Sequence, residues 1–364
     1  MFLPIKKILN NIGLNFDNIL KDDSKKEYLL NEINVYYKIN LTTFDNIDTL
    51  DDLEYTITKL TNSHAIMFHH FHNNSFKKYA QGSITEKDLE DIILTIGREN
   101  ILNGDVWLEK YKNGELKKGE TCFTFDDGLL CQYKVALPIL EKYKIRGLWF
   151  IYTKPIIGEY EFLECYKYFV GNNFDNFELF YEEFFELCQN YPKFKQECND
   201  FNEENDYVKF VSFYTFNDRK FRYLRDKIMS KEEFNNVIKE LMQLYNFNLD
   251  NIIEKVWMNE NELINLNKSQ IIGIHSHTHP TIMEDLNYNQ QFEEYKRCKD
   301  ILEKILKKEI NILSYPCGKY NSDTFDILKK LNIKYSFISY LSIPTNYKNY
   351  LIQREDHIKF INNI

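Results

Sequence analysis

Short apolar runs alternate with longer segments of mixed apolar and polar residues over much of the chain. Short continuous apolar runs predict buried strands, and apolar positions three and four apart predict helices that cover them. The predicted strands span residues 65–68, 121–125, 147–152, 271–274, 310–313, 334–339 and 350–353, and the predicted helices include 129–144, 284–307 and 322–331. Strand, helix and strand in succession make a βαβ unit, so the pattern predicts a parallel sheet or barrel covered by helices.

The pattern changes between residues 158 and 256, where the chain is helical in period, aromatic and acidic. No linker composition separates this segment from its neighbours, so we predict a helical insertion that covers the rim of the barrel. The barrel itself is predicted from residues 61–157 and 257–364. Residues 1–60 are predicted to form an N-terminal helical extension.

Composition narrows the class of protein. Of 364 residues, 43% are hydrophobic and 16% aromatic, which is enough for a large core. A formal net charge of -9 gives no basic footprint, which argues against a nucleic-acid binder. The seven cysteines include no C-x-x-C pair, the N-terminal residues are not a persuasive secretion signal, and no run of about 18 apolar residues could span a membrane. We therefore expect a cytoplasmic protein; the pattern leaves its oligomeric state open.

Groups of chemically reactive residues directly follow predicted strands. Asp126 and Asp127 end the run 121–125 and are followed by Gly128, and a histidine-rich loop follows the strand 271–274. Taken alone, an Asp-Gly pair after a strand is also typical of a turn with solvated carboxylates. The loops after parallel barrel strands meet at one rim, however, and active sites of such barrels lie there.

His275 and His279 are spaced as metal ligands. Gly273 before them and Pro280 after them place the pair in a loop rather than within a helix. Two neutral imidazoles and one carboxylate from the acid pair leave coordination positions open, as in hydrolytic metal sites. Zinc is the expected divalent ion, and cobalt, nickel or iron would accept the same ligands. His277 alternates away from this pair and is expected outside the coordination sphere.

Three motifs carry a family resemblance. Thr124-Phe125-Asp126-Asp127-Gly128, His275-Ser276-x-x-His279 and Ser314-Tyr315-Pro316-Cys317-Gly318 resemble, in order, the first three motifs of the polysaccharide deacetylase family, carbohydrate esterase family 4. The resemblance covers residues 64–152 and 257–357. It implies a distorted (β/α) barrel, here with a long, mainly helical insertion between the first and second motifs. It also implies metal-dependent hydrolysis of an N-acyl group on a sugar.

The resemblance also implies roles for individual residues. Asp126 would be the general base, and Asp127 would bind the metal beside His275 and His279. The metal would polarise the acyl carbonyl and acidify the attacking water. The backbone N–H of Cys317 would help to hold the oxyanion.

The chain departs from the family pattern at two positions. Ser314 stands where the third motif usually has an arginine, and we predict that Arg354 from the last strand supplies the missing charge. His357 is the nearest counterpart of the family's general acid, with His69 or His70 as competing candidates. Substrate contacts are expected from Tyr315, Pro316, His70 and Arg222.

A basic segment, residues 218–226, lies within the predicted insertion. Arg219, Arg222 and Arg225 alternate with aromatic residues, and arginine binds phosphate or carboxylate groups through paired hydrogen bonds. An ordinary helix whose arginines pair with nearby acids is the alternative.

Together these features predict a metal-dependent N-deacetylase. The expected substrate is a small-molecule or lipid-linked amino sugar, joined to a nucleotide or a lipid during surface-glycan assembly. Two alternatives remain: a deformylase or other amide hydrolase with a non-sugar substrate, and a catalytically inactive glycan-binding protein, which Ser314 favours.

Overall fold

The computed structural model describes residues 16–37, 41, 43–44, 47, 49–50, 52–53, 56–57, 63–78, 80–209, 214–341 and 348–360. Within them, seven parallel strands form one sheet in the order β6-β5-β4-β3-β2-β1-β7. The strands are β1 (Ala65–Phe68), β2 (Phe123–Phe125), β3 (Leu148–Ile151), β4 (Ile271–Ile274), β5 (Ile312–Ser314), β6 (Tyr335–Phe337) and β7 (Arg354–Asp356). Phe337 of β6 pairs in parallel with Ile352, just before β7, so the two edges meet. The predicted distorted (β/α) barrel is confirmed.

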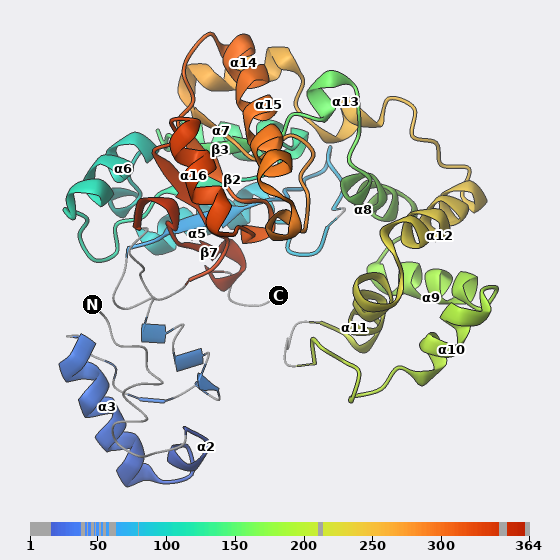
Figure 1. Ribbon diagram of the computed structural model, residues 1–364, viewed down its shortest axis with the longest axis horizontal. Helices are drawn as coiled ribbons and strands as arrows, with labels where there is room; N and C mark the ends of the chain where they lie inside the picture. The colour runs from blue at the N-terminus through green and yellow to red at the C-terminus, as the bar shows by residue number, and fades with distance from the viewer. Residues whose placement is uncertain are drawn as a thin grey trace.

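Helices cover the outside of this barrel (Figure 1). They are α5 (Glu86–Ile96), α6 (Gly104–Asn113), α7 (Leu137–Lys142), α14 (Glu260–Ser269), α15 (Tyr288–Leu306) and α16 (Ser322–Lys330). Helix α15 begins four residues later than predicted, because Asn287 and Gln290 form a capping box at its start. The helix predicted over 129–144 is divided into a π-helical turn, Gln132–Ala136, and α7. The last strand lies at 354–356 rather than 350–353.

Side chains from non-adjacent strands meet inside the barrel. The rings of Phe150 on β3 and Phe337 on β6 lie 5.2 Å apart, although two strands separate them in the sheet. Gly273 of β4 faces the same interior, where an added Cβ would lie 2.7 Å from side-chain atoms of Phe150 and Ile312. Only glycine fits that position, which explains the break in the apolar strand.

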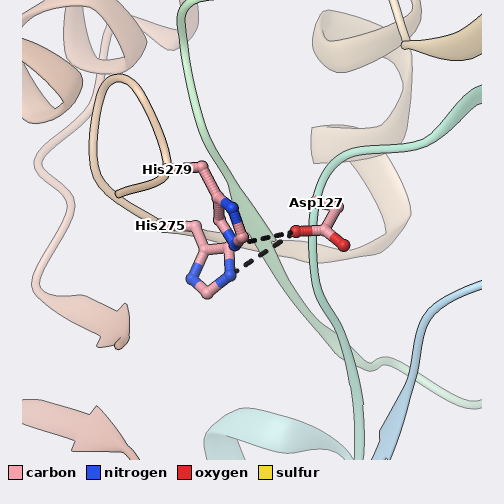
Figure 2. A group of neighbouring side chains, drawn as sticks. All are labelled: Asp127, His275 and His279. Atoms are coloured by element: carbon pink, nitrogen blue, oxygen red, sulfur yellow. Dashed lines mark ion pairs between the residues drawn. The ribbon is translucent and has the colours of Figure 1, made fainter. Parts of the chain in front are cut away.

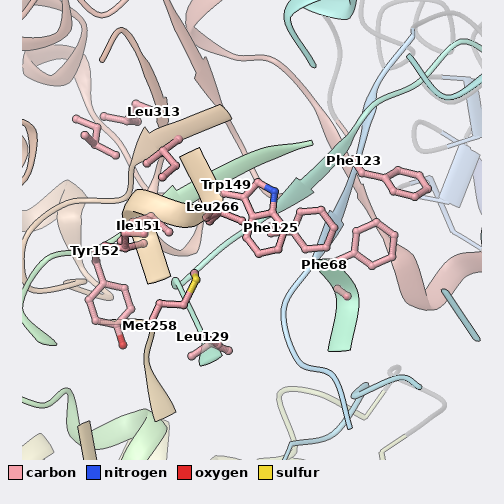
Figure 3. Close-up of a cluster of buried hydrophobic side chains, with 14 of the residues drawn as sticks. Phe68, Phe123, Phe125, Leu129, Trp149, Ile151, Tyr152, Met258, Leu266 and Leu313 are labelled. Atoms are coloured by element: carbon pink, nitrogen blue, oxygen red, sulfur yellow. The ribbon is translucent and has the colours of Figure 1, made fainter. Parts of the chain in front are cut away.

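An aromatic row on the other face of the strands fixes their carboxyl ends. Phe68 of β1 stacks on Phe125 of β2 at 5.2 Å, and Phe125 stacks on Trp149 of β3 at 4.3 Å (Figure 3). All three side chains are buried. Asp126 leaves β2 directly after Phe125, so this packing sets the position of the acid pair.

Helices between β3 and β4 surround a hydrophobic core of their own. They are α8 (Phe162–Asn173), α9 (Phe177–Cys188), α10 (Pro192–Asp200), α11 (Phe216–Tyr223) and α12 (Lys231–Leu244), whereas the following helix α13 (Ile252–Val256) packs into the barrel core. Phe180, Phe184 and Phe221 are buried in this core. In Figure 1, α8 to α12 form a group beside the barrel. The first and second motifs are thus separated by a helical insertion, as predicted; its boundaries, 158 and 256, stay a prediction.

The described part of the N-terminal extension contains α2 (Phe16–Ile19) and α3 (Asp23–Tyr37), drawn apart from the barrel in Figure 1. Residues 1–15, 38–40, 42, 45–46, 48, 51, 54–55 and 58–60 of the predicted extension lie outside the described residues. None of the described helices combines the length and the apolar character that crossing a membrane requires.

Candidate metal centre and active site

The acid pair turns out of β2 into the rim of the barrel. Asp127 has a left-handed backbone (φ 77), and Gly128 after it has φ 66. Left-handed backbone at a non-glycine residue is uncommon and costs free energy, so the surrounding contacts must hold it. One such contact joins the Asp126 amide to the Phe68 carbonyl at 3.2 Å. The turn directs two adjacent carboxylates, both buried, to different partners.

Asp127 meets both predicted histidine ligands (Figure 2). Its Oδ1 atom lies 3.6 Å from Nε2 of His275 and 3.4 Å from Nε2 of His279. The Nδ1 atom of His275 lies 2.7 Å from the carbonyl oxygen of Ser314, which leaves Nε2 to face the carboxylate. One ligand atom from each of the three residues lies within 4.8 Å of the others.

This arrangement fits a divalent metal ion. Ligand atoms about 2.0–2.2 Å from a tetrahedral zinc ion lie about 3.4 Å from one another, close to the spacing observed here. Burial lowers the pKa of both imidazoles, that of His279 to about 3, so both rings are in the neutral form that binds metal. Burial raises the pKa of Asp127, and Glu164 and Asp126 raise it further. A cation would offset this by favouring the ionised carboxylate.

Glu294 on α15 holds the loop between the two histidines. Its carboxylate accepts hydrogen bonds from the amides of His277 and Thr278, at 3.0 and 2.8 Å, and from the Thr278 hydroxyl at 2.8 Å. The His277 ring points away from the centre, because its Nδ1 atom lies 2.8 Å from the Thr153 hydroxyl. No sequence signal marks Glu294 as part of the site, because it lies outside the motif whose loop it supports.

Asp126 has a different partner. Arg354 donates from Nη1 to Oδ1 at 2.7 Å and from Nη2 to Oδ2 at 2.8 Å, and Nη2 also donates to the Ser314 hydroxyl at 2.7 Å. Ser314 in turn donates to Oδ2 of Asp126 at 3.1 Å. Burial would raise the pKa of Asp126, but the Arg354 guanidinium holds it below its usual range. Arg354 thus lies where a charge was predicted to replace the motif arginine.

The three candidate general acids differ in their surroundings. His357 has Nδ1 3.1 Å from the Met67 carbonyl oxygen and Nε2 2.8 Å from that of Gly82, so backbone oxygens face both ring nitrogens. His70 has Nε2 2.9 Å from a carboxylate oxygen of Glu164. His69 lies on the wall of the cavity described below. Burial lowers its pKa to about 4, against the opposing influence of the Asp126 carboxylate.

Helix α8 of the insertion adds charged residues that sequence analysis did not identify. Glu164 is buried and accepts a hydrogen bond from Lys167. Its other carboxylate oxygen pairs with Nε2 of His70. Burial would raise the pKa of Glu164, but Lys167 and His70 lower it. The i, i+3 spacing of Glu164 and Lys167 is common in helices, so no sequence signal distinguished this pair.

A cavity of about 1510 Å³ lies between the barrel rim and the insertion. From the barrel, His69, His70, Cys317 and His357 line it, and from the insertion Arg222 does. Cys317 has a left-handed backbone (φ 52). Tyr315 is fully buried and donates a hydrogen bond to the Tyr350 carbonyl. It does not line the cavity, nor does Pro316, so the geometry gives no support to the substrate contacts predicted for these two.

Comparison with known proteins also points to the polysaccharide deacetylase family. The family model described as "Polysaccharide deacetylase" matches residues 215–336, which include the second and third motifs but not Asp126 and Asp127. The second and third motifs thus lie in a region of the chain that is similar to the polysaccharide deacetylase family. No curated protein sequence matches the chain significantly.

Solved structures that are similar to this chain include the following three. The Streptococcus pyogenes deacetylase PplD in complex with acetate is 17% identical, with 81% of this chain and 91% of that chain covered and a TM-score of 0.48. IcaB from Ammonifex degensii is 13% identical, with 80% and 91% covered and a TM-score of 0.45. A de-N-acetylase from Aggregatibacter actinomycetemcomitans is 12% identical, with 80% and 93% covered and a TM-score of 0.45.

Proposed function

We propose that the protein is a metal-dependent hydrolase that removes the N-acetyl group from an amino sugar. The observation that carries this proposal is the pair of carboxylates with separate partners: Asp127 beside two imidazoles, and Asp126 held by Arg354. Similarity to the polysaccharide deacetylase family over residues 215–336 supports a carbohydrate deacetylase. The finer proposal is a sugar carried on a nucleotide or a lipid during surface-glycan assembly.

Each residue of the site has a distinct task in this proposal. Asp127, His275 and His279 would hold the ion, which when bound polarises the acyl carbonyl and lowers the pKa of water. Asp126, kept ionised by Arg354, accepts a proton from the attacking water. The Cys317 backbone N–H donates to the developing oxyanion. Water adds to the acyl carbon, the C–N bond breaks, and the products are acetate and a free amine.

The leaving nitrogen needs a proton, and we assign its delivery to His69. The rings of His70 and His357 already face a carboxylate and two carbonyl oxygens, respectively. His69 lines the cavity and interacts electrostatically with Asp126. Because burial keeps the His69 ring neutral near pH 7, it receives the water proton by way of Asp126 and then transfers it to the nitrogen.

Acetate release from a neutral N-acetylated oligosaccharide tests this proposal. The zinc-loaded protein should release acetate and expose an amine, and Asp126→Asn should keep zinc while losing turnover. Asp127→Ala should lose both zinc and turnover. Formate release from an N-formyl analogue instead would favour the deformylase. Absence of hydrolysis of neutral, nucleotide-linked and lipid-linked acylated sugars alike in the metal-loaded protein would favour a glycan-binding protein.

A further inference from the structure

The cavity between the barrel rim and the insertion reaches Pro280, the residue directly after His279. On the barrel side it is lined by His69 and Cys317, and on the insertion side by Tyr181 and Arg222. Its volume of about 1510 Å³ exceeds the space that an N-acetyl sugar alone fills, since pockets for whole drug-sized ligands are about 300–1,000 Å³. The remaining space would take a second part of the substrate.

The three arginines of the basic segment have different partners. Arg219 donates to Asp206 at 2.7 Å, and Arg225 makes two bonds to Asp226, at 2.6 and 2.8 Å. In the described part of the chain, no carboxylate forms an ion pair with Arg222. Its guanidinium lies 3.9 Å from the centre of the Tyr214 ring, and its Nη2 donates to Gln81 at 3.0 Å.

The Nε atom of Arg222 is buried, and no described residue forms a hydrogen bond with it. Leaving a charged donor buried and unpaired costs free energy, so such groups are rare in native proteins without a function or a ligand. Arg222 lines the cavity, so an anion there would satisfy this donor and supply the missing counter-charge.

Acidic residues of the insertion also line the cavity, but none of the described ones forms an ion pair with Arg222. Three carboxylates on α9, on α11 and on the π-helical turn after α11 line the same cavity, but each already accepts hydrogen bonds. Asp218 accepts from Gln81 and Tyr181, Asp226 from Arg225 and Tyr207, and Glu178 from Thr215 and Asn217. Lys78 and Lys231 also line the cavity, are exposed, and form no ion pair with any described residue.

We propose that Arg222, with Lys78 and Lys231, forms a subsite for a phosphate or diphosphate group of the substrate. The inference rests on the proposed function, because it places the N-acetyl sugar at the metal centre and its phosphate at the insertion. A planar guanidinium fixed by a stacked ring suits phosphate oxygens, and the lysines add charge without fixed geometry. Nucleoside diphosphate sugars and lipid diphosphate sugars share this chemistry.

Direct binding of a small phosphate tests the subsite without turnover. We would titrate the metal-loaded, full-length protein with phenyl phosphate and, as a carboxylate of similar size, benzoate. The protein should bind phenyl phosphate more tightly, and Arg222→Gln should weaken that binding by about tenfold or more. Arg219→Gln is the matched control, since Arg219 pairs with Asp206 and does not line the cavity; its affinity should match that of the parent. The double variant Lys78→Gln/Lys231→Gln, at two exposed sites, should weaken binding without affecting folding.

Kinetics then identify the source of the phosphate. Arg222→Gln should raise KM by a larger factor for a phosphate-linked N-acetyl sugar than for a neutral N-acetylated oligosaccharide. The nucleoside diphosphate and polyprenyl diphosphate forms are assayed separately, and the better substrate of the parent identifies the source.

Equal affinity for phenyl phosphate in the parent and in both the Arg222→Gln and the lysine variants would overturn the subsite. If the protein binds benzoate as tightly as phenyl phosphate, the subsite is not specific for phosphate. Acetate release from the neutral oligosaccharide is independent of these results, so the subsite and the deacetylase activity can fail separately.

Discussion

Arg354 holds both carboxylate oxygens of Asp126, at 2.7 and 2.8 Å, although β1 lies between their two strands in the sheet. Both side chains are buried, and 228 positions separate them in the chain. The contact places a positive charge where the third motif has only Ser314. It weakens the main argument for a catalytically inactive protein, which was the loss of that charge.

Replacement of Arg354 should show how much the buried Asp126 carboxylate depends on this positive charge. Arg354→Gln leaves the Asp126 carboxylate buried without its counter-charge, which should destabilise the protein by about 3–5 kcal/mol. Urea unfolding measures the change. Because the penalty comes from the unpaired carboxylate, Asp126→Asn/Arg354→Gln should be more stable than Arg354→Gln alone. A double variant that is less stable than the single one would contradict this explanation.

Glu294 should control metal affinity without touching the metal. Glu294→Ala removes the acceptor for the His277 and Thr278 amides, so the loop that carries His275 and His279 loses its support. We expect zinc to bind about 10–100 times more weakly, as measured by competition with a chelator. Glu293→Ala, at an exposed site on the same helix, serves as the control and should bind zinc like the parent.

The general acid is distinguished by comparing two histidines. His69→Gln should lower kcat by about 10²–10⁴-fold with zinc content unchanged, because it removes the proton donor to the leaving nitrogen. His357→Gln should chiefly lower stability, since the His357 ring lies between the backbone oxygens of Met67 and Gly82. A large loss of kcat in His357→Gln, with turnover retained in His69→Gln, would reverse the assignment.

The lowered pKa of Glu164 should make the stability of the protein depend on pH. Burial opposes its ionisation, but Lys167 and His70 lower its pKa below the unfolded value of about 4.3. A carboxyl group with a lowered folded-state pKa stabilises above its unfolded pKa, and this stabilisation is lost as the pH falls through the folded pKa. Glu164→Gln should therefore be less stable than the parent at pH 7, by about 1–3 kcal/mol, with a smaller difference below about pH 4.

Denaturant unfolding at pH 7 and below about pH 4 measures the difference in stability between Glu164→Gln and the parent. Glu182→Gln, at an exposed position on α9, is the control and should unfold like the parent at both pH values. A difference between Glu164→Gln and the parent that does not change with pH would show that the Glu164 charge contributes nothing.

Much of the fold followed from the sequence because its signals are local. Buried strands are short apolar runs, and the loops after parallel strands must meet at one rim. The order of residues along the chain was therefore enough to predict that Asp126, Asp127, His275 and His279 lie close together. Errors arose where local signals compete: the capping box at Asn287 moved the start of α15, and the last strand begins at Arg354 rather than at residue 350.

The sequence by itself determined the strand order along the chain, the motifs and the types of ligand that they offer. Only the tertiary structure decided which charges meet. It paired Arg354 with Asp126, Glu294 with the histidine loop, and Glu164 with His70, and among the described residues it brought no carboxylate into an ion pair with Arg222. The chain has 55 acidic and 46 basic residues, so each arginine has many potential partners, and packing of distant segments selects among them.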